Sequence, residues 1–341
     1  MKLNLILRKV FTISLLLANL IGFTQTQIEP YLNEIKTDSL QSYVYTLCSK
    51  QMEGRETGKK GGKTAANYIA SIFRKIEIDS VGYNGYFQKF NLTTDSLGNT
   101  DKHYFVLDDS IHNLQAQNII AFIEGSQHNN ETIVISAHYD HLGKRNDSTI
   151  YYGADDNASG VASLIEIARV MQIAANHEIK PARNILFLAF DAEEKGWLGS
   201  TYFLNNLPDT LGSILLNINL DMIGRNRYND NKYDQSVFMV SKGKKRGYYK
   251  RLIRKSNNSN HNLSISRYPR PFSNIALRSF SDHFVFMKKG IPFIHFQTGM
   301  HKDYHTINDT PDKINYKKLT EFSKFLCNFV WEVSNTGRKL I

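Results

Sequence analysis

The stretch from residue 132 to residue 194 contains the alternation that decides the fold. It begins with the apolar run TIVISA (132–137), continues through GADDNASG (153–160) into VASLIEIARVM (161–171), and ends with NILFLAFDAEE (184–194). The first and last segments have the length and apolar character of buried strands, and the segment between them is long enough to be a helix packed against a sheet. This order of strand, helix and strand indicates an α/β fold with a largely parallel sheet.

Similar patterns extend this alternation on both sides. Three further apolar runs are interpreted as buried strands, Asn118–Ile123, Ile214–Leu220 and Pro292–Phe296, and the region from about Ile28 to Val81 is predicted to be helical. No repeat, Pro-rich linker or low-complexity tract divides the chain. We therefore expect residues 26–341 to form a single domain.

The first 25 residues are interpreted as a secretory signal with an approximate cleavage site. Three basic residues, Lys2, Arg8 and Lys9, precede an apolar run from Val10 to about Ile21, which is the layout of a leader for export. A transmembrane anchor is the alternative, but the run is shorter than the roughly 20 residues that a span needs, and no second candidate follows. We expect a periplasmic or secreted protein with no stable membrane span after removal of the leader.

Charge and cysteine content narrow the classes of function. The chain carries a formal net charge of +10, and loss of the three basic residues of the leader leaves about +7. The dense basic segment Lys242–Ser256 is interpreted as a solvated helix face, so no nucleic-acid partner is predicted. The only two cysteines, Cys48 and Cys327, exclude a disulfide framework and a Cys-rich metal site. A bound metal must therefore use His and carboxylate ligands.

Acidic and imidazole side chains gather just after the carboxyl ends of the predicted strands, where ligands bind in open α/β sheets. Most candidates follow one of four predicted strands, and two lie in the loop 153–160 before the central helix. The full set is His138, Asp140, Asp155, Asp156, Glu193, Glu194, Asp221, His301 and His305. Carboxylates mixed with imidazole suit Zn²⁺ or a similar ion, and so large a set exceeds the need of one tetrahedral ion. Two ions are therefore expected, bridged by one carboxylate. One of the Asp155–Asp156 pair, with His138, His305, Glu194 and Asp221, supplies the required number.

Six ordered motifs then carry a resemblance to a known family. They are SAHYDHLG (136–143), GADDNASG (153–160), DAEEKGWLGS (191–200), NLDMIGR (219–225), SDHFVFMKKGIPFIHFQTG (281–299) and HKDYHTINDT (301–310). With EGRETG (53–58) they resemble the co-catalytic di-zinc aminopeptidases of peptidase clan MH, whose relatives include glutaminyl cyclases and glutamate carboxypeptidase-like proteins. The resemblance spans roughly Met52 to Lys313 and implies a three-layer αβα sandwich with a mixed, largely parallel central sheet.

The resemblance implies two zinc ions per chain and a set of ligands. His138 and Asp221 would be the terminal ligands of one ion, and Glu194 and His305 those of the other. Asp156 would bridge them, because the family's bridging aspartate is followed directly by Asn. Relatives show a cis peptide bond after that aspartate, so a cis bond between Asp156 and Asn157 is expected as well.

The resemblance also implies the catalytic roles of a zinc-dependent exopeptidase. Glu193 would be the general base that activates a metal-bound water and then protonates the leaving amine. Tyr304 would donate a hydrogen bond to the developing oxyanion. Asp140 would orient the ring of His138. The favoured function is an aminopeptidase that hydrolyses the N-terminal bond of peptides with a free N-terminus.

Neighbouring residues have simpler interpretations. Glu193 and Glu194 in isolation would be solvated carboxylates at a helix start, where negative charge is favoured. His141, His283 and His301 match no ligand position of the family, so they are expected on the surface or behind the ligands. Two carboxylates, Asp282 and Asp309, would either orient a neighbouring ligand or cap a loop.

Three other functions compete with the aminopeptidase. A glutaminyl cyclase has a similar sequence but uses one zinc ion, and the intact motifs at 153–160 and 191–200 favour a hydrolase. A catalytically inactive binding module is the least favoured, because all five ligands and the base are present. A carboxypeptidase remains open, because specificity lies in the pocket walls and not in the metals. Those walls are expected within Asn226–Ser281, where Tyr228, Tyr268, Phe272 and Phe280 either line a pocket or belong to the core.

Overall fold

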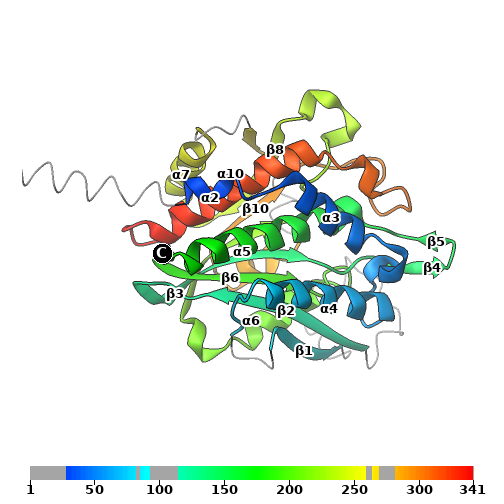
Figure 1. Cartoon of the computed structure of the whole chain (residues 1–341), viewed down its shortest axis with the longest axis horizontal. Coiled ribbons are helices and arrows are strands. Elements are labelled where there is room, and N and C mark those ends of the chain that lie inside the picture. The colour runs from blue at the N-terminus through cyan, green and yellow to red at the C-terminus, as the bar shows by residue number, and fades with distance from the viewer. Residues whose placement is uncertain (1–27, 82–84, 93–113, 259–262, 269–280, 341) are drawn as a thin grey trace, which may run out of the picture.

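The computed structural model describes residues 28–81, 85–92, 114–258, 263–268 and 281–340 (Figure 1). The predicted leader lies outside the described residues, so export of the protein stays a prediction. Within the described part, the chain forms helices packed on both faces of one large sheet.

The large sheet has eight strands in the order β1-β2-β6-β3-β7-β10-β8-β9. Its strands are β1 (Phe87–Leu92), β2 (Leu114–Ile123), β3 (His128–His138), β6 (Arg183–Phe190), β7 (Ser213–Leu220), β8 (Ser236–Lys242), β9 (Ser264–Arg267) and β10 (Phe293–Gln297). The central pairs β6–β3, β3–β7 and β7–β10 are parallel, as is β8–β9, and the other pairs are antiparallel. A separate hairpin pairs β4 (Lys144–Asn146) with β5 (Thr149–Ile150). The predicted α/β class with a mixed, largely parallel sheet is confirmed.

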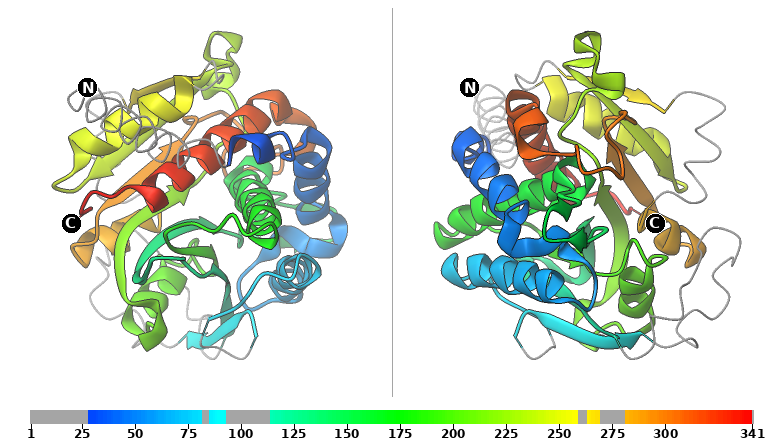
Figure 2. Two further views of the ribbon diagram at one scale, coloured as in Figure 1. Left: turned by 60° about the vertical axis from the view of Figure 1, so that its left-hand side comes forward. Right: turned by 90° about the vertical axis from the view of Figure 1, so that its right-hand side faces the viewer.

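The helices form the two outer layers. The main helices are α2 (Glu29–Leu32), α3 (Thr37–Leu47), α4 (Lys60–Lys75), α5 (Gly160–Asn176), α6 (Leu198–Asn205), α7 (Arg246–Asn258), α9 (His283–Lys288) and α10 (Tyr316–Asn335). Short helical turns are η1 (Lys50–Arg55), η4 (Ala154–Ser159), η5 (Asp209–Leu211), η6 (Arg227–Asn229), η7 (Asn231–Tyr233) and η8 (Pro311–Lys313). One hydrophobic core cluster lies between one face of the sheet and the helices α2, α3, α4, α5, α7 and α10. A second cluster lies between the other face and the helices α6 and α9. The turned views show α5 and α10 on one side and α6 on the other (Figure 2).

Strand alternation explains why one sheet can serve two cores. In β3, Ile133 and Ile135 face the larger cluster and Val134 faces the smaller one, because successive side chains point to opposite faces. Every residue of β6 is buried, as expected for a strand covered on both faces. All five strands expected from the sequence are present.

The helix α5 is the most buried of the outer layer. Together with η4 it forms the stretch Ala154–Asn176, which among the described residues is long and apolar enough to cross a membrane by length and composition. Most of this stretch is buried inside the protein, which is the usual situation of a core helix. Its apolar character therefore follows from packing against β3 and β6 of the sheet and against the neighbouring helices α3 and α10.

Two sequence interpretations concern residues away from the sheet edge. The basic segment forms α7, whose apolar residues Tyr249, Leu252 and Ile253 are buried while Arg251 and Arg254 are exposed, so the interpretation as a helix face is confirmed. Both cysteines are buried free thiols. Burial raises the pKa of Cys48 to about 12 and also raises that of Cys327.

Candidate metal centre

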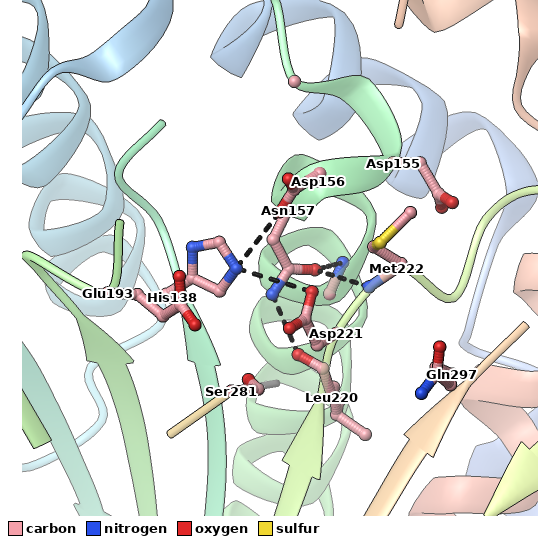
Figure 3. Close-up of polar contacts among 12 residues, drawn as sticks. His138, Asp155, Asp156, Asn157, Glu193, Leu220, Asp221, Met222, Ser281 and Gln297 are labelled. Carbon is pink, nitrogen blue, oxygen red and sulfur yellow. Dashed lines mark hydrogen bonds and ion pairs between the residues drawn. The ribbon is translucent and has the colours of Figure 1, made fainter. Parts of the chain in front are cut away.

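The ends of the parallel strands bring the predicted residues together, and Figure 3 shows His138, Asp156, Glu193 and Asp221 among them. His138 is the last residue of β3, Asp221 directly follows β7, and Glu193 and Glu194 lie in the turn after β6. Asp156 lies in η4, just before α5. His305 comes from the loop after β10 and meets them there. The predicted convergence of these side chains on one rim of the sheet is thus observed.

The turn η4 has a backbone that its sequence makes possible. Gly153 precedes it with φ +56°, and a Cβ at that position would lie 2.2 Å from the carbonyl oxygen of Asp156. Glycine is therefore required there. The bond between Asp156 and Asn157 is cis, as expected. The side-chain amide of Asn157 donates a hydrogen bond to the backbone carbonyl of Leu220 at 2.9 Å, which connects η4 to the end of β7.

A first group of possible metal ligands surrounds His138. Its Nε2 lies 3.3 Å from Oδ1 of Asp156 and 3.4 Å from Oδ1 of Asp221. Glu193 joins His138 and Asp221 in this group, with ligand atoms within 4.8 Å of one another. All four residues are buried.

A second group lies on the other side of the same aspartate. Nε2 of His305 is 3.1 Å from Oδ2 of Asp156 and 3.3 Å from Oε1 of Glu194. Because Oδ1 of Asp156 faces the first group and Oδ2 the second, this carboxylate lies between them. Asp155 instead points away (Figure 3) and accepts hydrogen bonds from the Gly224 N–H and the Ser159 hydroxyl.

The second group contains a histidine that the sequence places on the surface or behind the ligands. His141 is buried, and its Nδ1 lies 3.0 Å from Oε1 of Glu194 and 3.7 Å from Oδ2 of Asp156. A surface position is therefore wrong for His141. The signal available in the sequence was its spacing, three residues after His138 at the same strand end. The other two are buried as well: His301 lies 3.2 Å from Asp155, and His283 stacks on the ring of His295.

Asp140 connects the turns on which the two groups depend. Its carboxylate accepts hydrogen bonds from the backbone N–H groups of Glu193 and Glu194 at 3.1 and 3.2 Å and from the hydroxyl of Thr57 at 3.1 Å. The carboxylate is 3.7 Å from Nδ1 of His138, and the carbonyl oxygen of Asp140 is nearer at 3.2 Å. Asp140 therefore contacts His138 mainly through its backbone, and its side chain orients the turn after β6.

A second buried carboxylate, Asp309, supports η4. It accepts hydrogen bonds from the backbone N–H groups of Asp155 and Asp156 at 3.0 and 3.1 Å, and it lies 3.6 Å from Arg225. Of the two roles considered for Asp309, loop capping is the one observed. Asp282 is also buried, and burial raises its pKa to about 7.

Charges in the two groups interact strongly because most of these side chains are buried and lie close together. Burial works to raise the pKa of Asp156, but hydrogen bonds from His138 and His305 hold it well below the usual range. Against the same effect of burial, contacts with His141 and His305 lower the pKa of Glu194 to about 2. Burial works to lower the pKa of the partner histidine His305, but its contacts with Asp156 and Glu194 raise that pKa to about 10.

Glu193 differs from its neighbour Glu194. Burial raises the pKa of Glu193 well above its usual range, and the nearby carboxylates Glu194, Asp282 and Asp221 add to this effect while His138 opposes it. The indole N–H of Trp197 donates to Oε1 of Glu193 at 3.0 Å. Adjacent in sequence, these two glutamates therefore have opposite electrostatic environments.

A cavity of about 350 Å³ opens onto both groups. Tyr304 lines it with its ring stacked on that of His305, and burial raises the pKa of the phenol, which keeps it protonated as a hydrogen-bond donor. The remaining wall residues are Met222, Arg227, Tyr228, Tyr268, His295, Gln297 and Met300. Tyr228 and Tyr268 are thus cavity residues, and Phe272 and Phe280 lie outside the described residues.

Similarity to known proteins agrees with this geometry. The model of the family described as "Peptidase family M28" matches residues 118–330. Aminopeptidase YwaD of Bacillus subtilis is 27% identical over 237 residues, covering 67% of this chain and 47% of that protein. The chain spans less than half the length of the first curated relatives it matches.

Solved structures share the fold. The LapA aminopeptidase of Legionella pneumophila superposes with a TM-score of 0.67 at 22% identity, covering 92% of this chain and 75% of that one. A glutaminyl cyclase of Bacteroides thetaiotaomicron superposes with a TM-score of 0.63 at 19% identity, covering 89% and 99%. The expected sandwich is therefore confirmed, and the fold is common to both activities.

Proposed function

The chain belongs to peptidase family M28, and on this premise we propose that it is a metallo-aminopeptidase that uses two zinc ions to hydrolyse the N-terminal bond of peptides with a free amine. The observation that carries the proposal is the carboxylate of Asp156, which offers one oxygen to each of two groups of ligand atoms. A carboxylate shared in this way is what a two-metal site requires.

The distances within both groups fit zinc. Zinc bonds of 2.0–2.1 Å at tetrahedral angles put neighbouring ligand atoms about 3.3 Å apart. The observed separations between the nitrogen and oxygen atoms are 3.3 and 3.4 Å in the first group and 3.0 to 3.7 Å in the second. Nitrogen and carboxylate oxygen donors are also the types that zinc accepts.

We assign the ligands accordingly. His138 and Asp221 would hold one ion and His305 and Glu194 the other, with Asp156 between them. His141 would be an additional donor on the side of Glu194, since its Nδ1 lies within the same group. When bound, the two ions supply Lewis acidity for the scissile carbonyl and lower the pKa of a water molecule.

Glu193 would act as general base and then as general acid. Its buried carboxylate lies beside His138 and Asp221, where it can accept a proton and later return it to the leaving amine. The hydrogen bond from Trp197 fixes the orientation of its carboxylate. Tyr304 would donate its phenolic hydrogen to the oxygen that gains negative charge, because its raised pKa keeps that hydrogen in place.

Two alternatives receive less support. A glutaminyl cyclase, expected to use one zinc ion, does not account for two neighbouring groups of possible ligand atoms. A carboxypeptidase would use the same groups, and its distinction from an aminopeptidase depends on which terminus of the peptide must be free.

The test combines metal analysis of the purified protein with a substrate panel. The panel contains an aminoacyl anilide, its N-acetylated form, a peptide blocked at the C-terminus, and a glutaminyl peptide that reports cyclisation. We expect two zinc ions per chain and cleavage of the substrates with a free amine, including the C-terminally blocked peptide. Dominant cyclisation, or cleavage only of peptides with a free carboxylate, would overturn the proposal.

A further inference from the structure

The cavity contains a single guanidinium among its described lining residues, that of Arg227. This arginine lies at the start of η6, in the stretch where the sequence motifs thin out. It shares the cavity with Glu193, Glu194 and Tyr304 of the proposed centre. A fixed positive charge beside a reaction centre restricts what the centre can accept.

Aromatic rings hold the guanidinium in place. Its central carbon lies 4.6 Å from the centre of the Tyr228 ring, 5.3 Å from that of Phe238 and 5.9 Å from that of Tyr233. One Nη donates to the Tyr228 hydroxyl at 2.8 Å. Stacking of this kind orients a guanidinium but leaves most of its in-plane N–H groups available.

Arg225 provides an internal comparison two residues earlier. Its guanidinium lies 2.9 Å from Asp303 and 3.6 Å from Asp309. In contrast, no carboxylate among the described residues lies within 4.0 Å of the guanidinium nitrogens of Arg227, and its buried Nε has no hydrogen-bond partner there. A guanidinium offers five N–H donors, and a carboxylate is its natural bidentate acceptor.

The rest of the cavity wall does not supply this acceptor. Met222, Met300 and Tyr268 present apolar surface, and Gln297 is neutral. Burial lowers the pKa of His295 well below its usual value, so this ring is neutral too. The charge of Arg227 therefore has no carboxylate partner among the described lining residues, and its guanidinium is left free to bind a ligand.

We propose that Arg227 binds a carboxylate of the substrate. The inference rests on the proposed function and specifies its substrate class: peptides whose N-terminal residue has an acidic side chain, or short peptides whose own C-terminal carboxylate lies in the cavity. Both present the same group to Arg227, and the resulting paired hydrogen bonds should favour a carboxylate over its neutral amide by roughly 10- to 100-fold.

Two matched substrate pairs separate these sources. Glutamyl anilide is compared with glutaminyl anilide, and leucyl-glycine with leucyl-glycinamide, each as a ratio of kcat/KM for the zinc-loaded enzyme. A ratio well above one in the first pair identifies the acidic side chain, and in the second pair the C-terminal carboxylate. In Arg227→Gln that ratio should fall by roughly 10- to 100-fold, whereas Arg227→Lys should keep part of it because the charge remains.

Lys302→Gln is the control, because it removes the same charge from an exposed position outside this cavity. Its ratios should equal those of the wild type. Calorimetric binding of glutamate and of glutamine to the zinc-loaded protein gives a readout that does not depend on turnover. Ratios near one in both pairs, with equal binding of the two amino acids, or an unchanged ratio in Arg227→Gln, overturn the inference. Failure to cleave any peptide with a free amine would contradict the proposed function instead.

Discussion

The two sides of the cavity are built in different ways. On the metal side, residues follow the ends of parallel strands and are fixed by hydrogen bonds to backbone, as Asp140 is to the turn after β6 and Asp309 is to η4. On the other side of the cavity, the wall around Arg227 comes from η6, β8 and β10, and stacking on aromatic rings holds the Arg227 guanidinium in place. Polar networks require particular residues at particular positions, whereas stacking can be achieved by many sequences. The chemistry should therefore tolerate little change, and the selectivity a great deal.

Removal of metal should have the largest effect. Dialysis against a chelator is expected to lower kcat by roughly 10³-fold or more for every substrate, because Lewis acidity and the activated water are lost together. Readdition of zinc should restore both the activity and the metal content measured by mass spectrometry. Full activity in protein shown to be free of metal would contradict the assignment.

Glu193→Gln should have the next largest effect. A neutral amide cannot accept a proton, so kcat should fall by roughly 10²–10⁴-fold for all substrates while the metal content stays unchanged. Glu194→Gln is the matched variant, and it should lose zinc because it removes a ligand oxygen. Unchanged kcat in Glu193→Gln would contradict its role as the base, and loss of zinc from this variant but not from Glu194→Gln would show that the two roles are exchanged.

His141→Ala should weaken one half of the centre. Loss of a donor beside Glu194 is expected to reduce the affinity for one zinc ion by roughly 10- to 100-fold, measured by competition with a chromogenic chelator. The control is His128→Ala, at the exposed start of β3. Equal zinc affinities in the two variants would mean that His141 only fills space.

Tyr228→Phe should have the smallest effect and should act only on selectivity. The change removes the hydroxyl to which Arg227 donates but keeps the ring on which it stacks. We expect the carboxylate-to-amide ratio of kcat/KM to change by about 2- to 5-fold. An equal loss of kcat for charged and neutral substrates would mean that Tyr228 contributes to the reaction itself and not to substrate selectivity.

The same contrast explains how much the sequence could predict. Strand ends and motif spacing correctly anticipated which side chains converge, and the Asn after Asp156 distinguished it from Asp155, which is committed to Gly224 and Ser159. They did not anticipate His141, because a histidine three residues beyond a strand can turn toward the site or away from it. The contact of Asp140 with the turn after β6 also depends on two segments that are far apart in the chain.

The missed strands of the large sheet have a similar cause. Three strands, β1, β8 and β9, lie toward the edges of the sheet, where one face or one side has fewer neighbours. In β1 the sequence FQKFNL alternates buried and exposed positions, so it lacks the continuous apolar run that identified the central strands. The backbone pairing of such strands is set by their neighbours more than by their own composition.

The two buried thiols allow local and global opening of the protein to be measured by chemical labelling. Cys48 directly follows α3 and Cys327 lies within α10, and both are protonated in the native state because burial raises their pKa. A thiol-directed reagent attacks the thiolate, so labelling must wait until the chain opens locally or globally. The two labelling rates, resolved by mass spectrometry, would separate fraying near α3 from unfolding around α10. Any active-site variant that labels at the native rate has kept its scaffold.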